Sequence, residues 1–433
     1  MGDIHLYNVR LPMKEQSQLY HILIKDGIYE KIEIQSGPKL GVSPIRLEEL
    51  ESQKVIDLEG RGVLPSFVDI HTHLDKAFSL ASVPNQSGTL QEAIQNYSDK
   101  ASSFTGEIIK ERVKRAAFQS LSFGTTFIRT HVNFEMDVSK DLALSHLQAV
   151  LEAKIELSPW MTIQVIPMFS NLSTRSKQEM ELVTEAISYG IDGIGGAPHL
   201  SLQAKDDIGV LFQLAVKNGK PLDLHVDEQD NPAICTIEEV IRETKRNDYQ
   251  GNVITGHLCS LAAMDESKAL MFMEQMAKEK IGAVTLPGAN LYLQGRGDKG
   301  KVRRGITRVK ELMENGVEVA TASDNVNDPF HPFGRGDLLQ IGLLTAYTAH
   351  LASEADLYNV LHMMTDIPGG FFGFDDYGIT EKSPASFVIV DNPDIYGLFA
   401  GLSPARYVFN QGRWVSATNT KTQIFGAREE WHV

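Results

Sequence analysis

The sequence is poor in cysteine, with only Cys235 and Cys259 among 433 residues. Two cysteines cannot form a disulfide framework, and these two lack the Cys-x-x-Cys spacing that is typical of a structural zinc site. Stability is therefore expected to come from a hydrophobic core, and a chain of this length can bury a large one.

Basic residues are also in the minority. The chain has 41 Lys and Arg against 56 Asp and Glu, which gives a formal net charge of −15. Nucleic acids and anionic membranes favour basic surfaces, so this charge excludes a nucleic-acid polymer as the expected partner. It favours a small neutral or cationic ligand instead.

Long apolar segments are missing as well. The longest apolar stretch, residues 338–352, is too short for a bilayer span and is interrupted by Gln340, Thr345 and His350. The first residues show neither the basic nor the apolar region of a signal peptide. These features predict a cytoplasmic protein, an enzyme or a binding protein, that does not enter membranes.

Strand-like apolar runs alternate with amphipathic helical segments through the middle of the chain. Eight such β-α units predict a (β/α)8 barrel of the TIM type over residues 62–379. Short β-rich segments at the two ends, residues 1–61 and 380–433, predict a small β-sandwich domain formed by both termini. The expected barrel strands are residues 62–73, 125–133, 161–169, 191–199, 222–228, 252–258, 281–287 and 317–325.

Polar residues gather at the C-terminal ends of these runs. Enzymes built on such barrels place their active sites at that end, so the position indicates function. The residues are His71, His73, His131, His199, Glu228, His257 and Asp324.

Four of these positions predict a metal site. His71 and His73 are two residues apart in a strand, so both imidazoles point to the same side and can reach one ion. His225 and Asp324, from two other strands, complete a set of three nitrogens and one oxygen with a position left for water. A divalent ion in such a site lowers the pKa of bound water towards about 7. Zinc and iron both accept these ligands.

Longer motifs resemble the cytosine deaminase branch of the amidohydrolase superfamily. They include HTHLDK, LHVDE, TGHLCS and ASDNVNDPFHP, in that order, and the more specific runs LQGR and RRGITRVKE. The resemblance covers nearly the whole chain. It implies a metal-bearing barrel with a terminal β-sandwich, with metal ligands at His71, His73, His225 and Asp324.

The resemblance also implies a reaction. Hydroxide on the metal would attack a C=N carbon of a small nitrogen heterocycle while Glu228 protonates the ring nitrogen. Asp324 would take the hydroxide proton and pass it to the leaving group, and His257 would steady the developing oxyanion. The products would be the hydroxylated ring and ammonia or an amine.

Substrate-facing positions depart from the cytosine deaminase pattern. Asn325 stands where that branch has a second Asp, Ser170 where it has Gln, Phe330 where it has Trp, and Lys76 where it typically has Thr. Gln294 matches a substrate-amide position, so these five residues are the predicted substrate contacts. Lys76 with Asn325 resembles the N-isopropylammelide amidohydrolases, and cytosine itself is expected to be a poor substrate.

Three other interpretations are kept. An N-alkyl-aminotriazine amidohydrolase fits the Lys76 and Asn325 combination. A cyclic amidase of the dihydropyrimidinase kind would need a bridging Lys or Glu on the strand at 191–199, where none occurs, so one divalent ion per chain is expected. An inactive metal-binding scaffold would not need Glu228 and His257 beside the ligands.

The sequence leaves four matters open. It does not name the heterocycle, decide between zinc and iron, or show whether the chain forms a homo-oligomer. His131 and His199 match no ligand position and are expected to be pocket-wall or hydrogen-bonded core residues.

Overall fold

The computed structural model describes residues 3–15, 17–300, 303–404, 406–420 and 422–423. Contacts divide the chain into two compact units. One consists of Met1–Ser66 with Gly378–Val433, and the other of Phe67–Tyr377.

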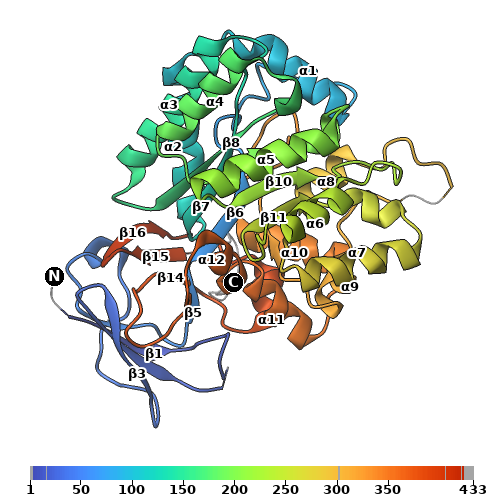
Figure 1. The fold of residues 1–433 in the computed structure, drawn as a ribbon. Coiled ribbons are helices and arrows are strands. Elements are labelled where there is room, and N and C mark those ends of the chain that lie inside the picture. Colours follow the sequence, from blue (N-terminus) through green and yellow to red (C-terminus); the bar gives the residue numbers. More distant parts are fainter. Residues whose placement is uncertain (1–2, 16, 301–302, 405, 421, 424–433) are drawn as a thin grey trace. The chain divides into compact units, whose positions relative to one another are not determined.

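The terminal unit contains two four-stranded sheets (Figure 1). Leu6 and Ile22 of one sheet pack into the same hydrophobic core as Phe387 and Phe409 of the other, so the sheets form a sandwich. Strands from both ends of the chain therefore share this core. The first sheet has the order β3 (Ile28–Ile34), β2 (Tyr20–Lys25), β1 (Ile4–Val9), β4 (Val55–Asp57), and the second β16 (Arg413–Thr418), β15 (Arg406–Asn410), β14 (Phe387–Val390), β5 (Gly62–Pro65).

The other unit is the predicted (β/α)8 barrel. Its eight strands are parallel and follow one another in chain order, and a parallel bridge between Thr72 and Asp324 joins the last strand to the first. All eight lie within the predicted runs. They are β6 (Phe67–Thr72), β7 (Thr125–Asn133), β8 (Thr162–Met168), β9 (Ile194–Gly196), β10 (Leu222–Val226), β11 (Val253–His257), β12 (Gly282–Thr285) and β13 (Val319–Thr321).

The first predicted run, residues 62–73, is two strands rather than one. Residues 62–65 form β5, which pairs antiparallel with β14 in the terminal unit, and the barrel strand begins at Phe67. Pro65 has no amide hydrogen to continue a ladder, so the chain can change sheets there.

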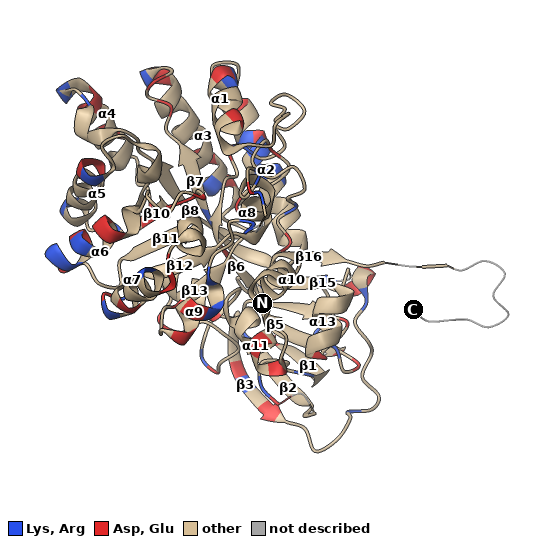
Figure 2. Ribbon diagram, turned by 90° about the vertical axis from the view of Figure 1, so that its right-hand side faces the viewer, with Lys and Arg blue, Asp and Glu red and all other residues tan. Residues whose placement is uncertain are grey.

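Helices surround the barrel strands, and Figure 2 shows the charged residues mainly on these helices rather than on the strands. Side-chain caps start several of them, as Thr89 does for α1 and Ser176 for α4. No described helix is long and apolar enough to cross a membrane. The helices are α1 (Leu90–Ala101), α2 (Gly106–Ser122), α3 (Lys140–Leu157), α4 (Lys177–Ser188), α5 (Ala204–Asn218), α6 (Thr236–Arg246), α7 (Glu266–Lys278), α8 (Pro287–Leu293), α9 (Val309–Glu314), α10 (Leu338–Ala349), α11 (Glu354–His362) and α12 (Asp366–Phe372).

An apolar cluster of the barrel unit lies against α12. Val68, Ile254 and Ala320 pack there against Phe372 of α12, and all four are buried. The polar side chains predicted to be functional lie at or just beyond the C-terminal ends of the strands.

Candidate metal centre and active site

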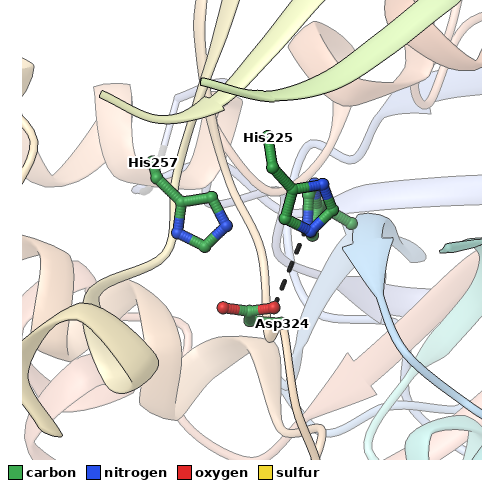
Figure 3. Close-up of side chains that lie close together, drawn as sticks. His225, His257 and Asp324 are labelled. Carbon is green, nitrogen blue, oxygen red and sulfur yellow. Dashed lines mark hydrogen bonds and ion pairs between the residues drawn. The ribbon is translucent and has the colours of Figure 1, made fainter. Parts of the chain in front are cut away.

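Three imidazoles and one carboxylate converge at the C-terminal ends of β6, β10 and β13. Nε2 of His225 lies 3.1 Å from Nε2 of His71 and 3.1 Å from Nε2 of His73. Oδ1 of Asp324 lies 3.4 Å from Nε2 of His73 and 3.8 Å from Nε2 of His71. Figure 3 shows His225 and His257 directed towards the carboxylate of Asp324.

These distances suit a divalent ion. Two nitrogens bound to zinc at about 2.1 Å and at a tetrahedral angle lie about 3.4 Å apart, close to the separations seen here. Nδ1 of His73 lies 3.2 Å from the carbonyl oxygen of His131 and so carries the proton, which leaves a lone pair on Nε2. Buried lone pairs that face one another repel unless a cation lies between them. The four residues therefore fit a metal.

Local backbone geometry supports this convergence. Asp324 has φ 60° and His257 has φ 70°, a left-handed conformation that costs a residue with a side chain about 1–3 kcal/mol. Gly256 gives His71 its room, because a Cβ there would lie 3.0 Å from Cε1 of the imidazole. Such strain is found where the surrounding structure fixes a residue for function.

A second buried cluster lies against His71. Oδ1 of Asp223 is 3.9 Å from Nδ1 of His71 and 3.4 Å from Nε2 of His131, and its Oδ2 accepts a hydrogen bond of 2.8 Å from Arg129. The carboxylate thus faces the outer nitrogen of a predicted ligand. His131 is accordingly a buried residue beside the ligands, with its ring centroid 4.0 Å from that of His71.

Glu228 and His257 lie together next to the four predicted ligands. Oε2 of Glu228 is 3.7 Å from Nε2 of His257 and 3.9 Å from Nε2 of His199. Nδ1 of His257 is 3.0 Å from Oδ1 of Asn290, which holds the proton on Nδ1 and leaves Nε2 facing Glu228. Nδ1 of His199 is 3.0 Å from the carbonyl oxygen of His225, so His199 is a hydrogen-bonded core residue.

Asp227 and Asp230, which lie close to Glu228 in the sequence, have structural roles. Asp227 accepts hydrogen bonds from the backbone and side chain of Thr236, both at 2.6 Å, at the start of α6. Asp230 accepts one of 2.7 Å from the amide of Gly295. Only Glu228 of the three acids is left to line the cavity.

The two carboxylates have opposite shifts in pKa because their partners differ. Burial raises the pKa of Glu228 to about 7, although His257 opposes the shift. Burial also raises the pKa of Asp324, but its hydrogen bond with His73 and the charges of His257 and Lys76 lower it more, so the net pKa falls. Burial lowers the pKa of His73 to about 3, which keeps this imidazole neutral as a ligand must be.

A cavity of about 310 Å³ opens at this cluster. His73, His225, Glu228, His257 and Asp324 form its polar end, and it extends towards the loops after β7, β8 and β9, where Phe134, Met168, Phe169 and Leu172 add apolar surface. Its size and mixed lining are those of a small-molecule site.

Four of the five predicted substrate contacts line this cavity: Lys76, Ser170, Asn325 and Phe330. Nζ of Lys76 lies 4.5 Å from the ring centroid of Phe330. Nδ2 of Asn325 donates to Oδ2 of Asp328 at 2.7 Å, so its amide oxygen remains for the cavity. Gln294 differs: its amide donates to the carbonyl oxygen of Glu228 at 3.3 Å, and its role as a substrate contact stays a prediction.

A family model described as "Amidohydrolase family" matches residues 86–400. The chain belongs to the amidohydrolase family. The predicted resemblance is thereby confirmed, and so is a hydrolase that acts on carbon–nitrogen bonds other than peptide bonds.

Individual amidohydrolases resemble the chain over most of its length. Pterin deaminase of Rhizobium rhizogenes is 28% identical over 87% of this chain and 83% of its own length. N-isopropylammelide isopropyl amidohydrolase of a Pseudomonas species is 26% identical, over 85% and 88%. The crystal structure of 5-methylcytosine deaminase from Klebsiella pneumoniae with 5-fluorocytosine has a TM-score of 0.88 and 27% identity, covering 98% of this chain and 99% of that one.

Sequence reasoning missed several residues at this amidohydrolase site. Asn290, Asp223, Asn133 and Glu135 contact predicted site residues or line the cavity, and none belongs to a motif of two histidines or a strand-end acid. Asp223 alone had a signal, because it lies two residues before His225 in one strand and so points to the same face.

Proposed function

We propose that the chain is a hydrolytic deaminase or aminohydrolase of a small nitrogen heterocycle, with one divalent ion, zinc or iron, held by His71, His73, His225 and Asp324. One observation carries the proposal: Glu228 and His257 face each other at 3.7 Å beside these four residues, on the wall of one cavity. A site that only stored metal would not need an acid and a fixed imidazole next to the ligands.

The bound ion would supply a nucleophilic water at neutral pH. Glu228, protonated below its pKa of about 7, gives its proton to the ring nitrogen beside the attacked carbon. Asp324, ionised, takes one proton of the attacking water and passes it to the departing nitrogen, and the other water proton restores protonated Glu228. The new C–O bond replaces the C–N bond, and His257 stabilises charge on the new oxygen.

Recognition falls to the side chains farther along the cavity. Phe330 adds an aromatic side chain to the wall, and Lys76 lies over its ring with two ammonium hydrogens free to reach a ring oxygen. Asn325 offers an amide oxygen, because its nitrogen is held by Asp328. Asn325 replaces the acid that would pair with the exocyclic amine of cytosine, so cytosine is expected to be a poor substrate.

The relatives define the rings to test. Their names give pterin, N-isopropylammelide and 5-methylcytosine as substrates of those proteins. An N-alkylamine as the leaving group is the second candidate, and Lys76 with Asn325 is the combination that favours it. A cytoplasmic location and a homo-oligomeric state also stay predictions.

Two measurements test the proposal together. Metal analysis of the purified protein is expected to return about one ion per chain, and a screen for released ammonia or amine over pyrimidines, purines, pterins and N-alkyl triazines is expected to find a substrate. Two ions per chain would favour a cyclic amidase. Bound metal with no hydrolysis of any ring would favour an inactive scaffold.

A further inference from the structure

Lys76 is a buried cation that lacks a carboxylate partner. The residue is only 3% exposed, and its Nζ donates to Oδ1 of Asn133 at 3.2 Å and lies over the Phe330 ring. The ion pairs of the described residues include none for Lys76. An ammonium has three N–H donors, so two remain for a group that enters the cavity. The Lys76 charge opposes the rise in pKa that burial causes in the acids Asp75, Glu135 and Asp328, but none of these forms an ion pair with it.

Asn133 links this cation to an acid. Its amide oxygen accepts from Lys76, its Nδ2 donates to Oε1 of Glu135 at 2.8 Å, and its backbone amide donates to Asp75 at 3.1 Å. Because both the oxygen and the nitrogen of its amide are hydrogen-bonded, the Asn133 side chain cannot flip. It holds a donor and an acceptor on the same wall of the cavity at a fixed separation.

Glu135 has one oxygen to spare. Oε1 is taken by Asn133, and within the described ranges no cation pairs with this half-buried carboxylate. Burial raises the pKa of Glu135, whereas the Asn133 hydrogen bond and the Lys76 charge lower it, with a net rise. The neighbouring acid Asp137 behaves differently, because Arg175 already binds both of its oxygens. Glu135 is thus the acid on this wall that is available to a ligand.

We propose that Lys76, Asn133 and Glu135 form a specificity site that reads a lactam edge of the substrate, with the ring carbonyl oxygen at Lys76 and the adjacent ring N–H at Glu135. This inference rests on the proposed deaminase function and defines its substrate class. The rings it admits carry an O=C–N–H unit in addition to the carbon that loses its amine. Asn133 is a positioning residue, because it acts by orienting the two that touch the ring.

The pairing of charges explains why a neutral edge fits. An isolated lysine would favour an anion and an isolated glutamate a cation, but the two together present one donor and one acceptor with no net charge. A lactam offers the complementary acceptor and donor side by side. A ring nitrogen without hydrogen would leave Glu135 facing a lone pair, which penalises it.

The test compares three variants of the metal-loaded enzyme. Glu135→Gln keeps the side-chain shape, but Asn133 would hold its amide oxygen and turn the NH2 group towards the ring N–H. Glu135→Ala removes the acceptor and opens space. Asp137→Asn is the matched control on the same loop. Each is assayed for turnover, and by calorimetry for binding, with pterin, N-isopropylammelide, cytosine and 5-methylcytosine. Each ring is paired with its analogue methylated at the ring nitrogen beside the carbonyl.

The expected result is a pattern of selectivity. Wild type should prefer each accepted ring over its N-methyl analogue by about 10- to 100-fold in kcat/KM, the usual range for one hydrogen bond to a charged group. Glu135→Gln should lower kcat/KM for the parent ring by a similar factor. Glu135→Ala should have similar kcat/KM for the parent ring and its N-methyl analogue, and Asp137→Asn should behave as wild type. Metal content and melting temperature should stay unchanged in all three.

Two results would overturn the inference, and they have different consequences for the proposed function. If wild type acts on a ring and Glu135→Ala keeps the full preference over the N-methyl analogue, the specificity site is wrong and the deaminase function stands. If none of the four rings binds to or is hydrolysed by wild type at millimolar concentration, the specificity site and this substrate class both fail.

Discussion

The two sides of the cavity are built differently. On one side His71, His225 and His257 lie within β6, β10 and β11, and the imidazoles are buried and in contact with one another. On the other side Glu135 and Ser170 lie two residues beyond the ends of β7 and β8, where the chain is half-buried or exposed. Glu228 and Asp324 also follow their strands by two and three residues, but they are buried beside the imidazoles, whereas Glu135 and Ser170 lie where loops can vary without moving the chemical groups.

The difference extends to charge. The strand side holds neutral imidazoles and two acids with opposite pKa shifts, an arrangement that suits a cation and proton transfer. The loop side holds a buried lysine and a half-buried glutamate joined through an amide. Substitutions on the strand side should therefore abolish metal binding or chemistry, and those on the loop side should change which ring is accepted.

Removing a ligand should have the largest effect. His225→Ala removes the Nε2 atom that lies 3.1 Å from Nε2 of both His71 and His73, so the ion loses one of its proposed ligands. We expect bound metal to fall well below one per chain and kcat/KM to drop by about 1000-fold or more. Metal analysis and steady-state kinetics on one preparation check this.

His146→Gln is the matched control for that variant. His146 is equally buried but lies on α3, where its Nε2 is 2.8 Å from the carbonyl oxygen of Phe104. It should keep its metal. Full metal content in His225→Ala would mean that this histidine is not a ligand.

Activity should fall at alkaline pH because of Glu228. Its pKa is raised to about 7 by burial, and the proposed reaction needs the protonated form, which exists below that pKa. Above it, the protonated fraction and hence kcat/KM should fall by about tenfold per pH unit. A pH profile checks the sign: a rate that rises from pH 7 to 9 would show that the ionised form of Glu228 is the active one.

Lys76→Met should have a smaller effect and leave the chemistry intact. Loss of a charged donor to a ring oxygen should lower kcat/KM by about 10- to 100-fold, mostly through KM, with metal content unchanged. Lys177→Met is the matched control, because Lys177 is exposed at the start of α4, outside the cavity, and its loss should change kcat/KM by no more than about twofold. Equal effects of the two variants on kcat/KM would show that Lys76 does not bind the ring.

The sequence predicted the strand side better than the loop side. Strand ends follow from alternating patterns, so the positions of His71, His225 and Asp324 on one edge could be inferred before any coordinates. The role of Asn133 depends on three hydrogen bonds to residues in two segments, and no local pattern encodes them. Gln294 shows the converse, because its motif suggested the substrate whereas its amide contacts the backbone of Glu228.

The change of sheet near Pro65 was also beyond a local pattern. Residues 62–73 read as one apolar strand, and only the pairing of β5 with β14, more than 300 residues away, divides them. Long-range pairing of this kind depends on which edge is available in the folded chain.

The most direct test of the proposed mechanism uses the Glu228→Gln variant. Metal content and turnover are measured on one preparation, with the ring that wild type hydrolyses fastest in the release screen. We expect the wild-type amount of metal with kcat lowered by about 100- to 10,000-fold, because only the proton donor is lost. Loss of the metal together with activity would show that Glu228 is a ligand. Retained activity would show that the proton comes from another group.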